Sequence, residues 1–166
     1  YQDGSIDAFG IKQYFTANGG RRWTYVPYSL TGLGQTQGNP LQANNNYLIN
    51  AATTGNMVVY LPSNALTGDI IRFCDISGNL QYNASLIIRA LKVDNQAVGI
   101  QGDLTGTKAN QGSQAALATA WDSVELIVQT RNASFGLLYV GASDAPGDPL
   151  ASEIPSNLRG WWLVEL

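Results

Sequence analysis

Acidic side chains are the residues of this chain that could carry hydrolytic chemistry. Two carboxylates that face each other across a sugar can act as the general acid and the nucleophile of a glycosidase. The candidates are Asp69, Asp75, Asp94, Asp103, Asp122 and Glu125. Most of them fall at strand ends or in turns, where aspartate is expected because its carboxylate accepts hydrogen bonds from backbone amides. We therefore interpret them as turn and surface groups, and a carbohydrate-active enzyme is the weaker hypothesis.

Histidine is absent from the chain. Its absence excludes the Ser-His-Asp and Cys-His mechanisms and removes both the most common general base and the usual zinc ligand. The single cysteine, Cys74, lies in the apolar run Ile70–Ile76. We interpret it as a small buried hydrophobe, since no histidine is present to activate its thiol. The chain is therefore expected not to be an enzyme, and to need no cofactor and no metal.

A short segment that begins at Asp75 faintly resembles a calcium-binding loop. Asp75, Ser77 and Asn79 have the alternate spacing of such a loop, but the acidic third and fifth positions and a suitably spaced downstream glutamate are missing. We predict a plain turn at this place. Gly32 and Gly34 lack the lysine and the strand–loop–helix context of a phosphate-binding loop, and they predict a flexible loop.

Aromatic residues gather in two β-prone segments. Trp23, Tyr25 and Tyr28 lie in the first, where Trp23 and Tyr25 share one face because alternate residues of a strand point the same way. The adjacent Trp161 and Trp162 lie in the second and must face opposite sides, so that one can fill the core while the other faces a neighbour. We predict core or subunit-interface positions for these residues. The alternative is that their rings stack on the sugars of a glycan.

The chain reads as short β-prone runs separated by Gly, Asn, Asp and Pro, which predicts an all-β fold. We expect an antiparallel β-sandwich or small barrel with long loops, in which residues 1–20 form an N-terminal arm or linker and residues 21–166 a single β-domain. One helical turn is predicted at Ser113–Ala120. The predicted strands are Trp23–Tyr28, Tyr47–Asn50, Met57–Leu61, Asp69–Cys74, Leu86–Leu91, Ala97–Ile100, Ser123–Thr130, Phe135–Val140 and Gly160–Glu165.

Three long, neutral segments are expected to be loops that serve binding or packing. They are Thr31–Asn46, Gly102–Gln114 and Gly141–Ser156. Charged residues make up only 13% of the chain, against roughly 25% in typical soluble domains. Neutral polar groups cost less to desolvate than charges, so such a surface suits a subunit of an assembly. The net charge of −3 disfavours a nucleic-acid partner, and no apolar run is long enough to insert into a membrane.

Two late runs, Val124–Val128 and Phe135–Val140, are apolar at nearly every position. We predict that they form a hairpin through the short connection Arg131–Ser134. Strands with two apolar faces are normally buried on both sides. In a small domain one face covers the core and the other needs a partner, which indicates oligomerisation.

The middle of the chain contains a series of strand-and-turn patterns, namely Leu61-Pro62, Gly68–Phe73, Asp75–Gly78, Asn83, Leu86–Arg89 and Trp121–Ile127. In these patterns residues 57–140 resemble a β-rich module of structural proteins from the baseplate wedge and the tail-fibre attachment of contractile-tailed bacteriophages. The neutral, Asn-rich composition is similar to that of phages that infect cyanobacteria.

This resemblance implies a homotrimeric or multimeric virion component, assembled in the host cytoplasm, that joins fibres to a tail or head. The family module has a mechanical role, so no catalytic residue is carried over. The expected partners are copies of the chain and other virion structural proteins. The second hypothesis is a receptor-recognition tip that binds a host surface glycan through Trp or Tyr stacking and the neutral loops.

Overall fold

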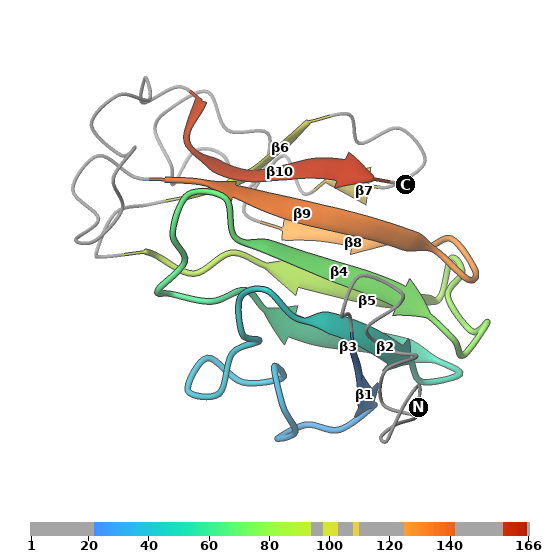
Figure 1. The fold of residues 1–166 in the computed structure, drawn as a ribbon. Helices are drawn as coiled ribbons and strands as arrows, with labels where there is room; N and C mark the ends of the chain where they lie inside the picture. Colours follow the sequence, from blue (N-terminus) through green and yellow to red (C-terminus); the bar gives the residue numbers. More distant parts are fainter. Residues whose placement is uncertain (1–21, 94–97, 103–107, 110–124, 142–157, 166) are drawn as a thin grey trace, which may run out of the picture.

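The computed structural model describes residues 22–93, 98–102, 108–109, 125–141 and 158–165. These residues form two β-sheets, which lie one behind the other in Figure 1. The six-stranded sheet contains, in spatial order, β1 (Trp23–Pro27), β2 (Asn46–Asn50), β4 (Ile70–Asp75), β9 (Ser134–Val140), β10 (Gly160–Glu165) and β6 (Ile100–Gly102). The four-stranded sheet contains β3 (Gly55–Tyr60), β5 (Ala84–Arg89), β8 (Glu125–Val128) and β7 (Lys108–Ala109).

The all-β fold class is confirmed, and each of the nine predicted strands overlaps an observed one. The short strand β7 was not predicted, because it lies in a segment expected to be a loop. Within the described residues neither sheet closes on itself, since β1 and β6 are the edges of one sheet and β3 and β7 the edges of the other. The predicted helical turn at Ser113–Ala120 and the predicted arm at residues 1–20 lie outside the described residues.

The sheets are mixed, so the expectation of purely antiparallel pairing is wrong. Strands β1, β2 and β4 run parallel in the large sheet, as do β6 and β10, while β3 and β5 run parallel in the small one. Parallel neighbours need a long crossover, which is usually a helix. Here β3 in the small sheet is the crossover between β2 and β4, and β4 is the crossover between β3 and β5. The chain thus alternates between the two sheets, which allows parallel pairing without helices.

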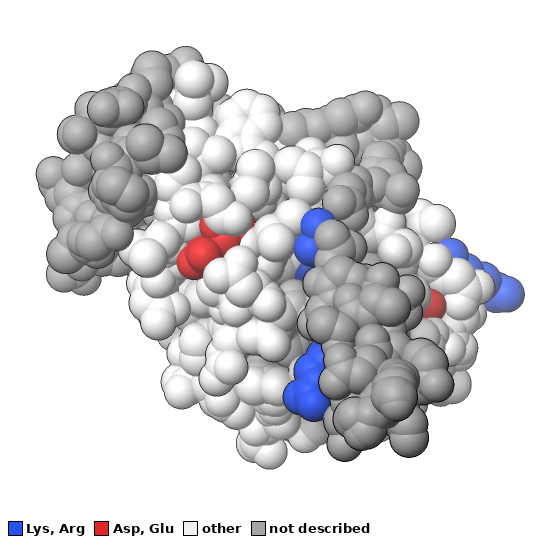
Figure 2. Space-filling model, viewed as in Figure 1, with Lys and Arg blue, Asp and Glu red and all other residues white. Residues whose placement is uncertain are grey.

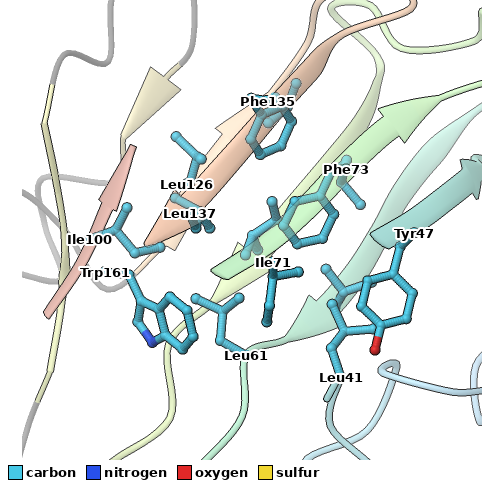
Figure 3. Packing of buried hydrophobic residues seen from close by; sticks show 14 of the residues in the cluster. Leu41, Tyr47, Leu61, Ile71, Phe73, Ile100, Leu126, Phe135, Leu137 and Trp161 are labelled. Atoms are coloured by element: carbon cyan, nitrogen blue, oxygen red, sulfur yellow. The ribbon is translucent and has the colours of Figure 1, made fainter. Parts of the chain in front are cut away.

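The core lies between the sheets because the strands alternate buried and more exposed residues. In the large sheet Ile71 and Phe73 of β4 are at most 1% exposed, and in the small sheet Leu86 and Ile88 of β5 are equally buried. Figure 3 shows the labelled core side chains filling this space. Phe73 stacks on Phe135 with ring centroids 5.1 Å apart, which joins two neighbouring strands through their inner faces.

The predicted hairpin between residues 124–128 and 135–140 is wrong. Strand β8 pairs with β5 and β7 in the small sheet, and β9 pairs with β4 and β10 in the large sheet. Their short connection therefore passes from one sheet to the other. Asn132 has a left-handed backbone at φ 55°, and its N–H donates to the carboxylate of Asp75 at 2.8 Å. This contact holds the connection against the end of β4.

The segment Thr31–Asn46, predicted as a loop, is packed and hydrogen-bonded. Gly34 accepts a hydrogen bond from the backbone N–H of Tyr60 at 2.7 Å, so the segment covers the edge of β3. Gly34 has φ 79°, and a Cβ atom there would lie 2.3 Å from a side-chain carbon of Leu41. The buried amide of Gln35 accepts from the N–H of Ser29 at 2.7 Å and donates to the carbonyl of Pro27 at 3.0 Å. The segment is therefore held by packing and hydrogen bonds, and the prediction of a flexible loop around Gly32 and Gly34 is wrong.

Candidate functional site

The described carboxylates do not converge. Asp69 precedes β4 and Asp75 ends it, so about 20 Å of extended chain separates them at roughly 3.3 Å per residue. Glu125 belongs to the other sheet. The remaining candidates Asp94, Asp103 and Asp122 lie outside the described residues. Within the described part of the chain, the acidic groups therefore form no pair that could act on a sugar.

Asp75 is 3% exposed and forms the turn predicted from its sequence. One carboxylate oxygen accepts from the N–H and the hydroxyl of Ser77, and the other accepts from the N–H of Asn132. The Ser77 hydroxyl oxygen in turn accepts from the N–H of Asn79 at 3.0 Å. These are the side-chain-to-backbone bonds of a turn. In the described residues no group of three or more His, Cys, Asp or Glu is placed to hold a metal ion.

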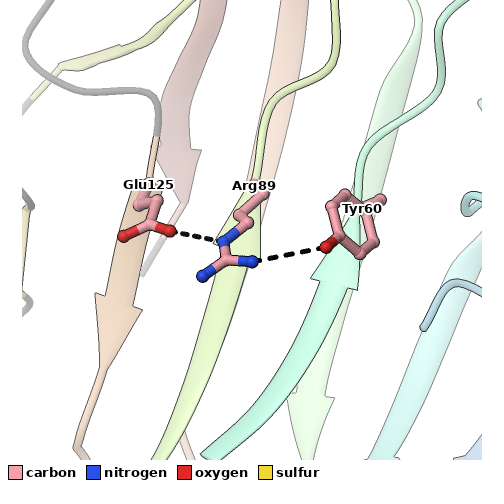
Figure 4. A network of polar contacts seen from close by, with 3 residues as sticks. All are labelled: Tyr60, Arg89 and Glu125. Carbon is pink, nitrogen blue, oxygen red and sulfur yellow. Dashed lines mark hydrogen bonds and ion pairs between the residues drawn. The ribbon is translucent and has the colours of Figure 1, made fainter. Parts of the chain in front are cut away.

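Glu125 pairs with Arg89 on the outer side of the small sheet (Figure 4). Arg89 Nε donates to a carboxylate oxygen of Glu125, and Nη1 donates to the hydroxyl of Tyr60 at 3.3 Å. Partial burial acts to lower the pKa of Arg89, but the hydrogen bonds to Tyr60 and Glu125 and the charge of Glu125 outweigh it and raise that pKa. This network joins β3, β5 and β8 through hydrogen bonds between their side chains, so we assign it a structural role in the small sheet.

The surface with the most unusual chemistry is the outer face of the six-stranded sheet, which we call the outer face. It is defined by the residues that alternate with the core residues along each strand, in the registers of the sheet. Its apolar members are Trp23, Tyr25, Pro27, Leu48, Ile70, Cys74, Leu138, Val140 and Trp162. Arg72 is the one charged residue among the outer-face side chains that the structure describes. Figure 2 views this side, where blue and red atoms are few among the described residues.

An antiparallel or mixed sheet that faces water normally alternates apolar with polar residues. On the outer face, Leu48, Ile70, Leu138 and Val140 are instead half-buried aliphatic side chains. The register places Ile70 of β4 opposite Leu138 of β9, and Leu138 opposite Trp162 of β10. Ile70, Leu138 and Trp162 therefore form an apolar row across β4, β9 and β10, while Leu48 lies opposite Cys74 in a separate row. The apolar character of β9 and of the run Ile70–Ile76 is evident in the sequence, but the position of Leu48, Ile70 and Leu138 on one face of a sheet was not predicted.

The first aromatic group lies at the edge of the outer face. Trp23 is 43% exposed and Tyr25 is 53% exposed on the edge strand β1, so neither belongs to the core. They share one face, as predicted, while Val26 points into the core and is 1% exposed. Tyr28 follows the strand and is also exposed. The core reading is therefore wrong for these three aromatic residues, and their rings are accessible.

The two adjacent tryptophans face opposite sides of β10, as predicted. Trp161 is fully buried and packs against Tyr139 with ring centroids 5.1 Å apart. Its ring is therefore unavailable to a glycan or to another subunit. Trp162 is half-buried on the outer face, and its indole N–H donates to the carbonyl of Leu158 at 2.7 Å. The five predicted site residues therefore do not form one site. Trp23, Tyr25 and Tyr28 lie together at β1, Trp162 lies on β10 across the sheet from them, and Trp161 is a core residue.

No model of a known protein family matches this chain, and no curated protein matches it either. The described residues contain no helix of the length and apolar character that crossing a membrane requires.

Proposed function

We propose that this chain is a non-catalytic structural subunit that assembles through the outer face of its six-stranded sheet. The observation that carries the proposal is the row of Ile70, Leu138 and Trp162 across β4, β9 and β10, on a face where Arg72 is the single charge among the described side chains. A contiguous apolar patch that stays in contact with water is typical of a protein contact. Covering it with a neighbouring subunit removes it from water at roughly 25 cal/mol per Å².

We further propose that the two sheets form a β-sandwich. The support is the single hydrophobic cluster to which both sheets contribute, with Phe73 and Leu137 from one sheet and Leu86 and Leu126 from the other. A sandwich has two outer faces. On that of the small sheet, Val58, Ile87 and Ile127 lie in one register row, but Arg89 and Glu125 lie on the same face and Ile87 is only 8% exposed. We therefore assign the proposed assembly contact to the outer face of the six-stranded sheet.

The class of assembly that we propose is a phage virion, with the chain as a tail, baseplate or fibre component and most simply a homotrimer. The support is the resemblance of residues 57–140 to the phage module, together with the low charge of the chain. The turn from Asp75 to Asn79, the strand around Ile87 and the strand around Leu126 all belong to the resembling region. The partners would be copies of the chain and adjacent virion proteins.

The test combines the oligomeric state with the accessibility of Cys74. Leu138 lies in the middle of the outer face, so a Leu138→Lys substitution introduces a charge that a subunit contact would have to desolvate. The wild type is expected to sediment as a trimer and the Leu138→Lys variant as a monomer. Cys74 lies on the same face and is the only cysteine, so a thiol reagent should modify it faster in the variant.

The control is Tyr82→Lys, which introduces the same charge at a loop residue that is 89% exposed and away from the outer face. It should leave both the sedimentation and the Cys74 modification rate unchanged. A wild-type chain that stays monomeric at high concentration would contradict the proposal. So would an oligomer that Leu138→Lys does not weaken.

A further inference from the structure

We propose that Trp23 and Tyr25 form a stacking platform for a neutral saccharide at the β1 edge of the outer face. The two side chains leave the same side of β1, with one residue between them, and their rings are accessible at 43% and 53% exposure. Their Cα atoms are about 6.6 Å apart, since a strand rises roughly 3.3 Å per residue. Two rings at this spacing can contact successive sugars of an extended chain.

The platform is rigid before any ligand binds. Strand β1 pairs along its whole length with β2, and Val26 anchors its inner side in the core. Asn46 donates through Nδ2 to the carbonyl of Arg22 at 2.9 Å, which ties down the start of the strand. A preformed site loses little conformational entropy on binding. Tryptophan and tyrosine also have only two side-chain torsions each to restrict.

Polar groups for sugar hydroxyls lie beside the rings. Asn50 donates through Nδ2 to the hydroxyl oxygen of Tyr25 at 2.8 Å. That bond uses a lone pair of the phenol and leaves its O–H proton to donate, while the amide oxygen of Asn50 can accept. The pair thus presents one donor and one acceptor next to a ring face. Sugar hydroxyls need this combination because each of them both donates and accepts.

The surroundings favour a neutral sugar over a charged ligand or a further subunit contact. Pro27, Asn46, Leu48 and Asn50, the outer-face residues of β1 and β2 beside the rings, are uncharged, while Arg22 precedes Trp23 and Arg72 lies beyond Asn46 in the register. The aliphatic row assigned to assembly is half-buried, whereas the two aromatic rings are more exposed and one is joined to an amide. Apolar ring faces bordered by a few fixed polar groups are the general chemistry of a small-ligand site.

The experiment measures binding of the full chain to a panel of neutral oligosaccharides, with uronic-acid oligosaccharides as a charged comparison. At least one neutral member should bind and shift the tryptophan emission, because Trp23 is exposed. Trp23→Ala and Tyr25→Ala should each weaken that binding at least tenfold. Tyr25→Phe keeps the ring and removes the hydroxyl, so it should weaken binding by a smaller factor. Tyr82→Ala removes a more exposed tyrosine elsewhere and should have no effect.

The outcomes separate this inference from the proposed assembly function. The saccharide site is refuted if no panel member binds the wild type, or if Trp23→Ala binds as tightly as the wild type. It is also refuted if Trp23→Ala and Tyr25→Ala lower the oligomer mass instead, because the rings then belong to a subunit contact. Leu138→Lys should abolish assembly while saccharide binding per chain is retained.

Discussion

Replacing Asp75 by Asn tests the view that this carboxylate is a structural clamp. Either orientation of the new amide places its NH₂ group against a donor, which is the N–H of Asn132 or the N–H of Ser77. One charge-assisted hydrogen bond, which contributes about 1.5–3 kcal/mol, is lost, and the remaining bonds become neutral. Because Asp75 is only 3% exposed, water cannot replace the lost partner. We expect the free energy of unfolding to fall by about 2–4 kcal/mol.

The measurement is urea unfolding followed by tryptophan fluorescence, since Trp161 in the core changes environment on unfolding. With a slope of about 2 kcal/mol per molar urea, the loss lowers the midpoint by about 1–2 M. The matched control is Asp69→Asn near the other end of β4. Its carboxylate also accepts from a side-chain amide and a backbone N–H, but at an exposed site, so the cost should stay below about 1 kcal/mol.

Two results would refute the clamp. One is an Asp75→Asn variant that loses less than about 1 kcal/mol, because three hydrogen bonds to a carboxylate of a residue that is only 3% exposed cannot be so weak. The other is a rise in the wild-type midpoint when calcium is added, because a ligand stabilises the state that binds it. Such a rise would instead support the calcium-loop interpretation of the segment from Asp75 to Asn79.

Three further perturbations test the packing and the electrostatics. Gly34→Ala should lower the free energy of unfolding by about 2–5 kcal/mol, because the φ of Gly34 is 79° and a Cβ atom there would overlap Leu41. The control Gly38→Ala has open space for a Cβ atom and should be neutral. Equal effects of the two substitutions in thermal unfolding would contradict this. Burial raises the pKa of Tyr47 above 10.0, so its contribution to stability is complete below pH 10 and is lost as the pH rises through the folded-state value. Above pH 10 the free energy of unfolding of the Tyr47→Phe variant should therefore fall less steeply with pH than that of the wild type. Parallel curves of unfolding free energy against pH would contradict this. A double-mutant cycle of Arg89→Met and Glu125→Gln should give a coupling energy below about 1 kcal/mol that decreases as salt is added, because the Arg89 side chain is 40% exposed. A larger coupling energy that does not change with salt would contradict this.

Local patterns were sufficient to locate most strands. Alternating or continuous apolar runs bounded by Gly, Asn and Pro predict the positions of β2, β4 and β9 within a few residues, because backbone pleating is a local property. The turn from Asp75 to Asn79 was predictable for the same reason, since the hydrogen bonds within the turn reach only two residues along the chain, whereas the bond from Asn132 to Asp75 was not predictable. Strand pairing was not predictable. The connection from β8 to β9 is short enough for a hairpin, yet it crosses between sheets.

Residue types and the two-residue period of a strand were enough to predict an all-β chain without the histidine-based chemistry of many enzymes, and opposite orientations for Trp161 and Trp162. Three features depended on the folded structure instead: which tryptophan is buried, the pairing of parallel strands through crossovers in the opposite sheet, and the exposed edge position of Trp23. These features arise from packing and hydrogen bonding between segments that lie far apart in the chain, and a local sequence pattern does not specify which segments become neighbours.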